Sequence, residues 1–195
     1  TDPQGPASTG ELFMPPGIGL GDISDPSLQD VYHALAFDNY VGAKQLLGAS
    51  KTKTKMDKFV RDYLAIAVEV EADWQLECIA HVAATGDLYT VSLMIGQTRG
   101  KFGNSLDKRL RHYEKRLATR SGTQLIEVGR AYVAACEAKD QPAIAAIVKN
   151  HGDTVYARAA TQHLEATKAG KLEHPLQWFL TADRYLARFE YLSPN

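Results

Sequence analysis

The chain has 195 residues, of which 45% are hydrophobic and 23% are charged, and its formal net charge is −1. This is the composition of an ordinary soluble globular protein that is long enough to bury a core. No apolar run approaches the ~18 residues of a membrane span, and two cysteines are too few for a disulfide framework, so we expect neither feature.

Residues 1–24 are predicted to form an irregular arm, because they contain four prolines and five glycines, which favour turns, and show no helical or strand period. An arm of this composition stays ordered only when something holds it. We expect the body of the protein or a protein partner to bind its apolar side chains, which are Leu12, Phe13, Met14, Ile18 and Leu20. The chain starts at Thr1, which fits removal of an organellar (mitochondrial) or secretory leader, or a trimmed chain.

Every segment from Asp25 onward has the apolar spacing of a helix, and no alternating strand pattern is longer than about four residues. In one segment, Met56, Phe59, Val60, Tyr63, Leu64, Ala67 and Val70 share this spacing. The predicted helices cover about 25–37, 39–47, 55–71, 73–85, 87–98, 105–119, 124–138, a short segment from 142, 153–168 and 175–191. We therefore predict an all-α fold of about nine stacked antiparallel helices, solenoid-like or an irregular bundle, in one domain over residues 25–195.

Two kinds of internal similarity run along the chain. The segment 57–63 (DKFVRDY) returns as 107–113 (DKRLRHY), and the segments 39–47, 87–95 and 140–148 also align. Stretches such as "CIAHVAATGDLYTVSLMI" and "YVAACEAKDQPAIAAIV" resemble tetratricopeptide, pentatricopeptide and HEAT-like helical repeats over residues 28–150. This resemblance implies a scaffold that binds proteins or RNA, although the tetratricopeptide Trp-Leu-Gly-Tyr pattern is absent and the usual period of about 34 residues is not kept.

Cys78 and His81 lie three residues apart and therefore share one helix face. The segment from Arg61 to His81 resembles the AhpD and carboxymuconolactone decarboxylase group, which implies a redox pair at Cys78 and His81. The first cysteine of that group's motif is missing here, so a two-thiol relay is excluded at this site. When residues 87–95 are aligned with residues 140–148, Cys78 and His81 fall on Ala131 and Ala134. This alignment instead predicts that Cys78 and His81 fill space in a helix pair.

Other chemical motifs are absent. The histidines show no metal-ligand spacing, and the glycines at 17, 19 and 21 follow no predicted strand, so we expect no metal and no nucleotide cofactor.

The segment SLDKRLRHYEKRLATR, residues 105–120, is strongly basic. Between Arg99 and Arg120 there are eight Lys or Arg residues and only two acids. Its cations suit acidic protein surfaces or phosphates: Arg109, Arg111, Lys115, Arg116 and Arg120. Aromatic residues are few here, so base stacking with single-stranded RNA is poorly supported.

The C-terminal segment PLQWFLTADRYLARFEYL is rich in large apolar side chains, including Trp178. Two apolar faces on one predicted helix favour either a closing cap of the stack or an interface. Taken together, the sequence favours a non-enzymatic α-helical scaffold, a protein-binding subunit of a larger assembly. A nucleic-acid-binding helical-repeat protein and a thiol- or metal-dependent enzyme at Cys78 and His81 are the alternatives.

Overall fold

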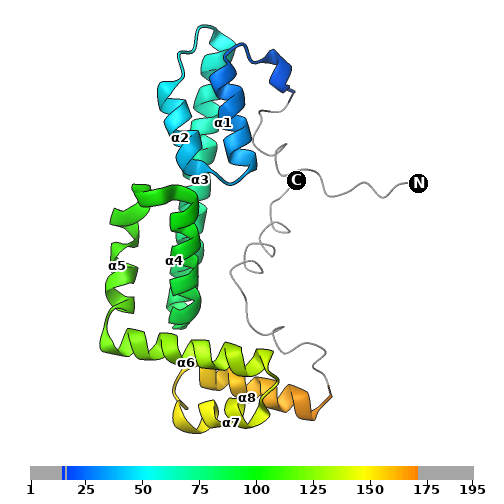
Figure 1. Ribbon diagram of the computed structural model, residues 1–195, viewed down its shortest axis with the longest axis vertical. Coiled ribbons are helices and arrows are strands. Elements are labelled where there is room, and N and C mark those ends of the chain that lie inside the picture. Colours follow the sequence, from blue (N-terminus) through cyan, green and yellow to red (C-terminus); the bar gives the residue numbers. More distant parts are fainter. Residues whose placement is uncertain (1–14, 16, 171–195) are drawn as a thin grey trace, which may run out of the picture. The chain divides into compact units, whose positions relative to one another are not determined.

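The computed structural model describes residue 15 and residues 17–170, and these residues form helices joined by short turns, with no strand (Figure 1). The α-helices are α1 (Pro26–Ala36), α2 (Tyr40–Ala49), α3 (Lys55–Thr85), α4 (Leu88–Phe102), α5 (Asp107–Leu117), α6 (Arg120–Glu137), α7 (Gln141–Asn150) and α8 (Val155–Lys168). Two short 3-10 helices, η2 (Leu20–Asp22) and η3 (Gly103–Leu106), precede α1 and α5. The all-α prediction is confirmed for this part of the chain, whereas the number of about nine helices and the solenoid-like stack are not. The helix predicted at 175–191 lies outside the described residues.

Two predicted helix boundaries are wrong. The helices expected at 55–71 and 73–85 are one continuous helix, α3, because Ala72, Gln75 and Leu76 continue its buried face through the expected break. The helix expected from 124 begins earlier, at Arg120, since the Thr119 hydroxyl accepts a hydrogen bond from the N–H of Gly122 and caps α6. Gly122 has no side chain to collide with the carbonyl oxygens that end α5, so the turn can be tight.

The described residues divide into two compact units. The first comprises residues 15, 17–75 and 98–106, and the second comprises residues 76–97 and 107–170. Helices α3 and α4 therefore contribute residues to both units.

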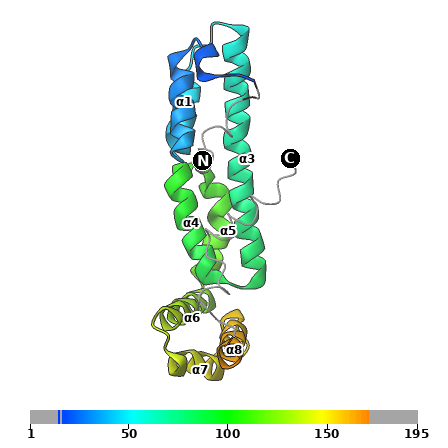
Figure 2. The same cartoon turned by 90° about the vertical axis from the view of Figure 1, so that its right-hand side faces the viewer.

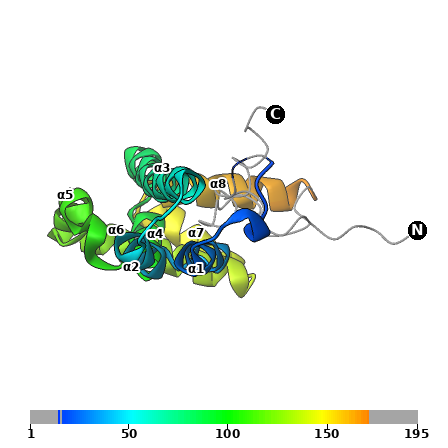
Figure 3. The same ribbon diagram turned by 90° about the horizontal axis from the view of Figure 1, so that it is seen from above.

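In the first unit, α1, α2 and the first part of α3 run alternately up and down beside one another (Figure 1), and Figure 2 shows α1 alongside α3. Figure 3 shows the same three helices nearly end-on. Their facing side chains form the core: Leu28, Val31 and Leu35 from α1, Tyr40 and Ala43 from α2, and Val60, Leu64 and Val68 from α3. The ring of Tyr40 also stacks on Phe102, with centroids 4.5 Å apart. Burial raises the pKa of Tyr40, so its hydroxyl stays neutral at physiological pH.

Asp57 joins the start of α3 to the residues before α1. Its side chain is almost completely buried, and it accepts hydrogen bonds from the Ser24 N–H (3.0 Å) and hydroxyl (2.6 Å) and from the Thr54 hydroxyl (2.8 Å). The Thr54 hydroxyl in turn accepts from the N–H of Asp57, which caps the helix. These hydrogen bonds lower the pKa of Asp57 to about 2, and the bond from the Ser24 hydroxyl has the largest effect.

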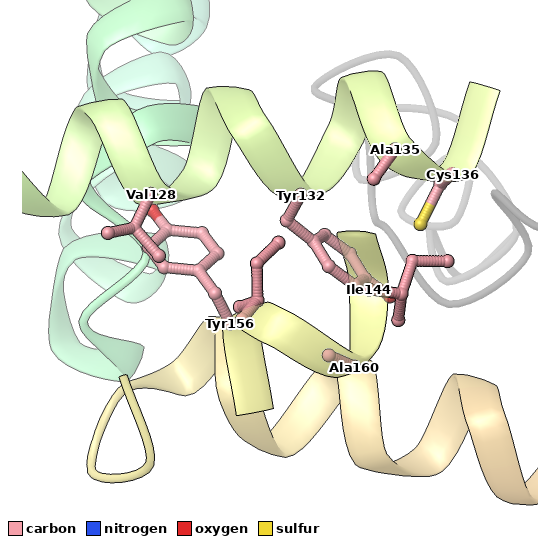
Figure 4. Close-up of a cluster of buried hydrophobic side chains, with 8 residues drawn as sticks. Val128, Tyr132, Ala135, Cys136, Ile144, Tyr156 and Ala160 are labelled. Carbon is pink, nitrogen blue, oxygen red and sulfur yellow. The ribbon is translucent and has the colours of Figure 1, made fainter. Parts of the chain in front are cut away.

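One buried cluster of the second unit lies between α6, α7 and α8, as the close-up in Figure 4 shows. Its buried side chains are Val128, Tyr132, Ala135, Cys136, Ile144, Ile147, Tyr156 and Ala160. The hydroxyl of Tyr156 accepts from the N–H of Tyr89 and donates to Asp87 Oδ1, both at 2.8 Å, and so satisfies the first turn of α4. Gly129 permits this approach, since a Cβ there would lie 2.5 Å from the Cβ of Tyr89 and 2.7 Å from the Tyr156 ring.

The helix pairs α1–α2, α3–α4 and α6–α7 share one kind of turn. Each turn contains a residue with a positive φ angle, namely Asp38 (58°), Gly86 (88°) and Lys139 (55°). The next residue caps the second helix by accepting the backbone N–H three positions on: Asn39 from Gly42, Asp87 from Thr90 and Asp140 from Ala143. In all three second helices the residue four positions after the cap is buried, Ala43, Val91 and Ile144. The alignment of residues 39–47, 87–95 and 140–148 thus corresponds to a common local geometry.

Candidate functional site

The most distinctive surface of the described residues is an apolar stripe along the first part of α3. It consists of Met56, Phe59, Tyr63, Ile66 and Val70, and we call it the α3 stripe. Four of its side chains are large apolar groups with high exposure: Met56 43%, Phe59 54%, Ile66 63% and Val70 60%. The ring centroids of Phe59 and Tyr63 lie 6.5 Å apart, with the ring planes tilted by 40°. The stripe is a continuous apolar face and not a set of scattered surface residues.

The α3 stripe lies on a different side of the helix from the core. Val60, Leu64 and Val68 are at most 3% exposed, while the stripe residues point about 120° away from them around the helix axis. The sequence pattern merged these two sets into one apolar group. It contained a signal that could have separated them, because Met56, Phe59, Tyr63, Ile66 and Val70 are spaced alternately by three and four residues. That is the spacing of a helix that packs against one other helix.

Charge changes sign along the helix beside the stripe. Lys55 lies next to its N-terminal end, and Glu69 and Asp73 lie near its C-terminal end. Glu69 forms an ion pair with Lys44 of α2 at 3.3 Å, with both side chains more than half exposed. Asp62, near the middle, pairs with the adjacent Arg61 at 2.8 Å. A helix lying on the stripe therefore meets a positive end and a negative end.

The predicted basic helix is shorter than expected and does not include all of its cations. Arg109, Arg111 and Lys115 are exposed on α5, whereas Arg120 is the first residue of α6. Arg116 Nη1 donates to the carbonyl oxygen of Ala83 at 3.1 Å and so joins α5 to the end of α3. Leu110 is fully buried and anchors α5. The structure thus places Arg109, Arg111 and Lys115 together on one exposed helix and gives Arg116 a structural contact.

The predicted contacts of the N-terminal arm and the C-terminal segment lie mainly outside the described residues. The residues that lie outside are Leu12, Phe13, Met14 and Trp178. The end of the arm is described, and there Ile23 is 3% exposed and Ser24 binds Asp57. Residues 23 and 24 are therefore part of the first unit.

Cys78 and His81 do not share an environment. Cys78 is 4% exposed, whereas His81 is exposed, which corrects the expectation that both fill space. The aligned residues Ala131 and Ala134 are both exposed, so the internal alignment does not support a space-filling role either. The redox pair at Cys78 and His81 stays a prediction.

The structure brings together a different cysteine and histidine, Cys136 of α6 and His163 of α8. Their Sγ and Nδ1 atoms are 3.8 Å apart, and both residues are buried. Burial raises the pKa of the Cys136 thiol, so the thiol is protonated at neutral pH and is a poor nucleophile. No sequence pattern indicates this pair, since the two residues are 27 positions apart on different helices. We interpret it as a satisfied polar pair within the core.

Within residue 15 and residues 17–170, no group of three or more His, Cys, Asp or Glu side chains is arranged to hold a metal ion. The helices of the same residues include none with the length and apolar character needed to cross a membrane.

Comparison with known proteins found no matching family model, no matching curated protein and no matching solved structure.

Proposed function

We propose that this chain is a non-enzymatic helical scaffold, a subunit that binds another protein through the α3 stripe. The observation that carries the proposal is the exposure of four large apolar side chains in register on one helix face. Contiguous exposed apolar surface of this kind is typical of protein interaction sites. Covering Met56, Phe59, Ile66 and Val70 would stabilise a complex by roughly 1–2 kcal/mol for each side chain, before the costs of association.

Two further features support this proposal. The second helices of the pairs α1–α2, α3–α4 and α6–α7 are capped by Asn39, Asp87 and Asp140, which stabilises these helices of the scaffold. Both cysteines are buried, so neither thiol is presented to a substrate. Residues 1–14 and the exposed cations of α5 are proposed as secondary contacts with the partner.

The test is to purify the tagged full-length protein from its native source and to identify what accompanies it. Phe59→Glu with Ile66→Glu should remove the partner, because two charges would have to be buried in an apolar interface. Both positions are exposed, so the circular dichroism spectrum and melting temperature should stay close to those of the wild type. Phe37→Glu is the matched control, since Phe37 is 83% exposed and lies outside the stripe. Retention of the same partner by the double variant would refute the proposal.

The role of the arm in partner binding is tested by a truncation whose end point is chosen from the structure. Removing residues 1–24 would also remove Ile23 and Ser24, which help to hold the first unit together. Removal of residues 1–14 alone leaves those contacts intact, and we expect weaker partner binding with unchanged stability. Equal binding by the truncated and complete chains would remove the arm from the proposal.

A second candidate function, nucleic-acid binding, has one observation in its favour. Arg109, Arg111 and Lys115 are exposed together on α5, where only Asp107 and Glu114 carry negative charge. Reversing these three cations to Glu should abolish a salt-sensitive affinity for a structured RNA. Arg116 is left unchanged because it binds the Ala83 carbonyl. The control reverses three exposed cations elsewhere, Arg130, Lys149 and Arg158, and should retain binding.

A further inference from the structure

From the spacing of the α3 stripe and the charges beside it, we propose that the stripe binds a second copy of this chain, with the two α3 helices antiparallel. This inference rests on the proposed function, because it names the partner of the same surface. The first argument is the spacing. Met56, Phe59, Tyr63 and Ile66 are separated by three, four and three residues, an order that reads the same in both directions and permits antiparallel pairing, while Val70 lies beyond the paired segment.

A two-fold interface requires that residue i contacts j while j contacts i. Antiparallel pairing of this segment satisfies that condition. Met56 of one copy lies opposite Ile66 of the other, and Phe59 lies opposite Tyr63, so two aromatic pairs form at the centre. All four positions have exposed or partly exposed side chains on one face of α3.

The second argument is charge. In the antiparallel register Lys55 of each copy lies beside Glu69 of the other, so opposite charges meet at both ends. A parallel arrangement would place Lys55 beside Val60 and Glu69 beside Trp74, so neither charge pair would form. The two Asp62 side chains approach near the two-fold axis, and the charge of each is offset by its own Arg61, 2.8 Å away. The charges therefore select the antiparallel orientation.

The size of this surface sets the strength of the association. Met56 and Ile66 are about 15 Å apart along the helix, so the pair buries less than the roughly 1,200 Å² of a standard stable interface. We therefore expect a monomer–dimer equilibrium that depends on protein concentration in the micromolar range.

Sedimentation velocity of the full-length chain tests this directly, with concentration raised from low to high micromolar. The wild type should move towards the dimer mass, and Phe59→Glu should weaken association by about a hundredfold or more, since each dimer loses two central contacts. Phe37→Glu should associate like the wild type. A wild type that remains monomeric at hundreds of micromolar, or a Phe59→Glu variant that dimerises normally, would overturn the inference.

Charge exchange tests the orientation. Lys55→Glu and Glu69→Lys should each weaken the dimer by about tenfold, because each creates like-charge pairs at both ends. The double variant Lys55→Glu/Glu69→Lys should recover wild-type association. Lys44→Ala removes the ion pair within the chain and leaves the Glu69 carboxylate to Lys55 of the other copy, so it should not weaken the dimer. Failure of the double variant to recover association would contradict the antiparallel register.

The outcomes also separate this inference from the proposed function. If the chain stays monomeric but the Phe59→Glu/Ile66→Glu variant still loses a partner from the native source, the stripe binds a different protein and self-association is wrong. If the dimer forms as described and the double variant keeps every accompanying protein, the stripe serves self-association alone, and the proposed function is wrong for any partner other than a second copy.

Discussion

A single carboxylate, Asp57, ties the residues before α1 to the start of α3. It is nearly inaccessible to solvent and accepts three hydrogen bonds from Ser24 and Thr54. Since its pKa in the folded protein is about 2, below the ordinary value of 3.8, protons bind the unfolded chain first as the pH falls. The stabilisation by Asp57 is therefore complete above about pH 4 and is lost between about pH 4 and pH 2.

The variant Asp57→Asn tests this account. At pH 7 we expect a lower melting temperature than that of the wild type, because the ionised acceptor of the Ser24 bonds is gone. The difference between the two proteins should shrink as the pH is lowered from 4 to 2. Melting curves across this range provide the measurement, and Asp30→Asn, at an exposed position, should behave like the wild type. A constant difference at all pH values would contradict the assignment.

Gly129 and Gly96 form a natural pair for testing packing. Both lie within α-helices, but a Cβ at Gly129 would collide with Tyr89 and Tyr156, whereas a Cβ at Gly96 would meet nothing within 4 Å. Gly129→Ala should lower the free energy of unfolding by about 1–3 kcal/mol. Gly96→Ala should raise it by about 0.5–1 kcal/mol, since alanine favours the helix. Urea denaturation measures both, and equal effects would mean that the approach of α6 to Tyr156 is wrong.

At the scale of elements, the turns between paired helices show which sequence signals are reliable. The caps Asp25, Asn39 and Asp140 were marked in the sequence by a short polar side chain just before an apolar run, and each accepts a hydrogen bond from the first turn of its helix. The continuity of α3 was missed because Glu71 and Asp73 look like a polar break, although their neighbours maintain the buried face. The early start of α6 was missed because its cap, Thr119, lies in a polar stretch without an apolar signal.

The positive φ angles of two of these turns lead to a prediction about helix ends. Lys139 adopts φ of 55°, a conformation that costs a residue with a side chain roughly 1 kcal/mol or more, while Gly86 adopts φ of 88° in the equivalent turn. Lys139→Gly should therefore stabilise the protein by about 0.5–1 kcal/mol. Gly86→Ala should destabilise it by a similar amount or more. Chemical denaturation distinguishes these signs, and a loss of stability in Lys139→Gly would contradict the turn geometry.

At the scale of the whole molecule, the fold class followed from local patterns, but the surfaces did not. Helical spacing shows that a segment has an apolar face, but it does not show which of two such faces the rest of the chain covers. Phe59 and Val60 are adjacent in the sequence, yet Phe59 is exposed and Val60 is buried. The pairing of Cys136 with His163 and the contact of Arg116 with Ala83 join residues 27 and 33 positions apart. Contacts of this range depend on how helices pack, and one sequence carries little information about that.

The reactivity of the two thiols tests the packing of the folded protein. Cys78 is 4% exposed and Cys136 is 0% exposed, so a water-soluble thiol reagent should modify the native protein far more slowly than the urea-unfolded protein. Both thiols should become reactive together with the loss of helical circular dichroism. Rapid modification of one thiol in the folded protein would show an accessible cysteine and would reopen the redox reading of Cys78 and His81.

The arrangement of Asp87, Gly129 and Tyr156 also offers a way to find relatives of this protein. The three residues depend on one another, because the glycine makes room for the tyrosine and the tyrosine binds the aspartate, 69 positions earlier in the chain. We expect substitutions at one of these three positions to be disfavoured while the other two are kept, whereas a chance match of helical spacing has no reason to contain all three. A search that requires all three at compatible positions on three helices would separate common descent from ordinary helix packing.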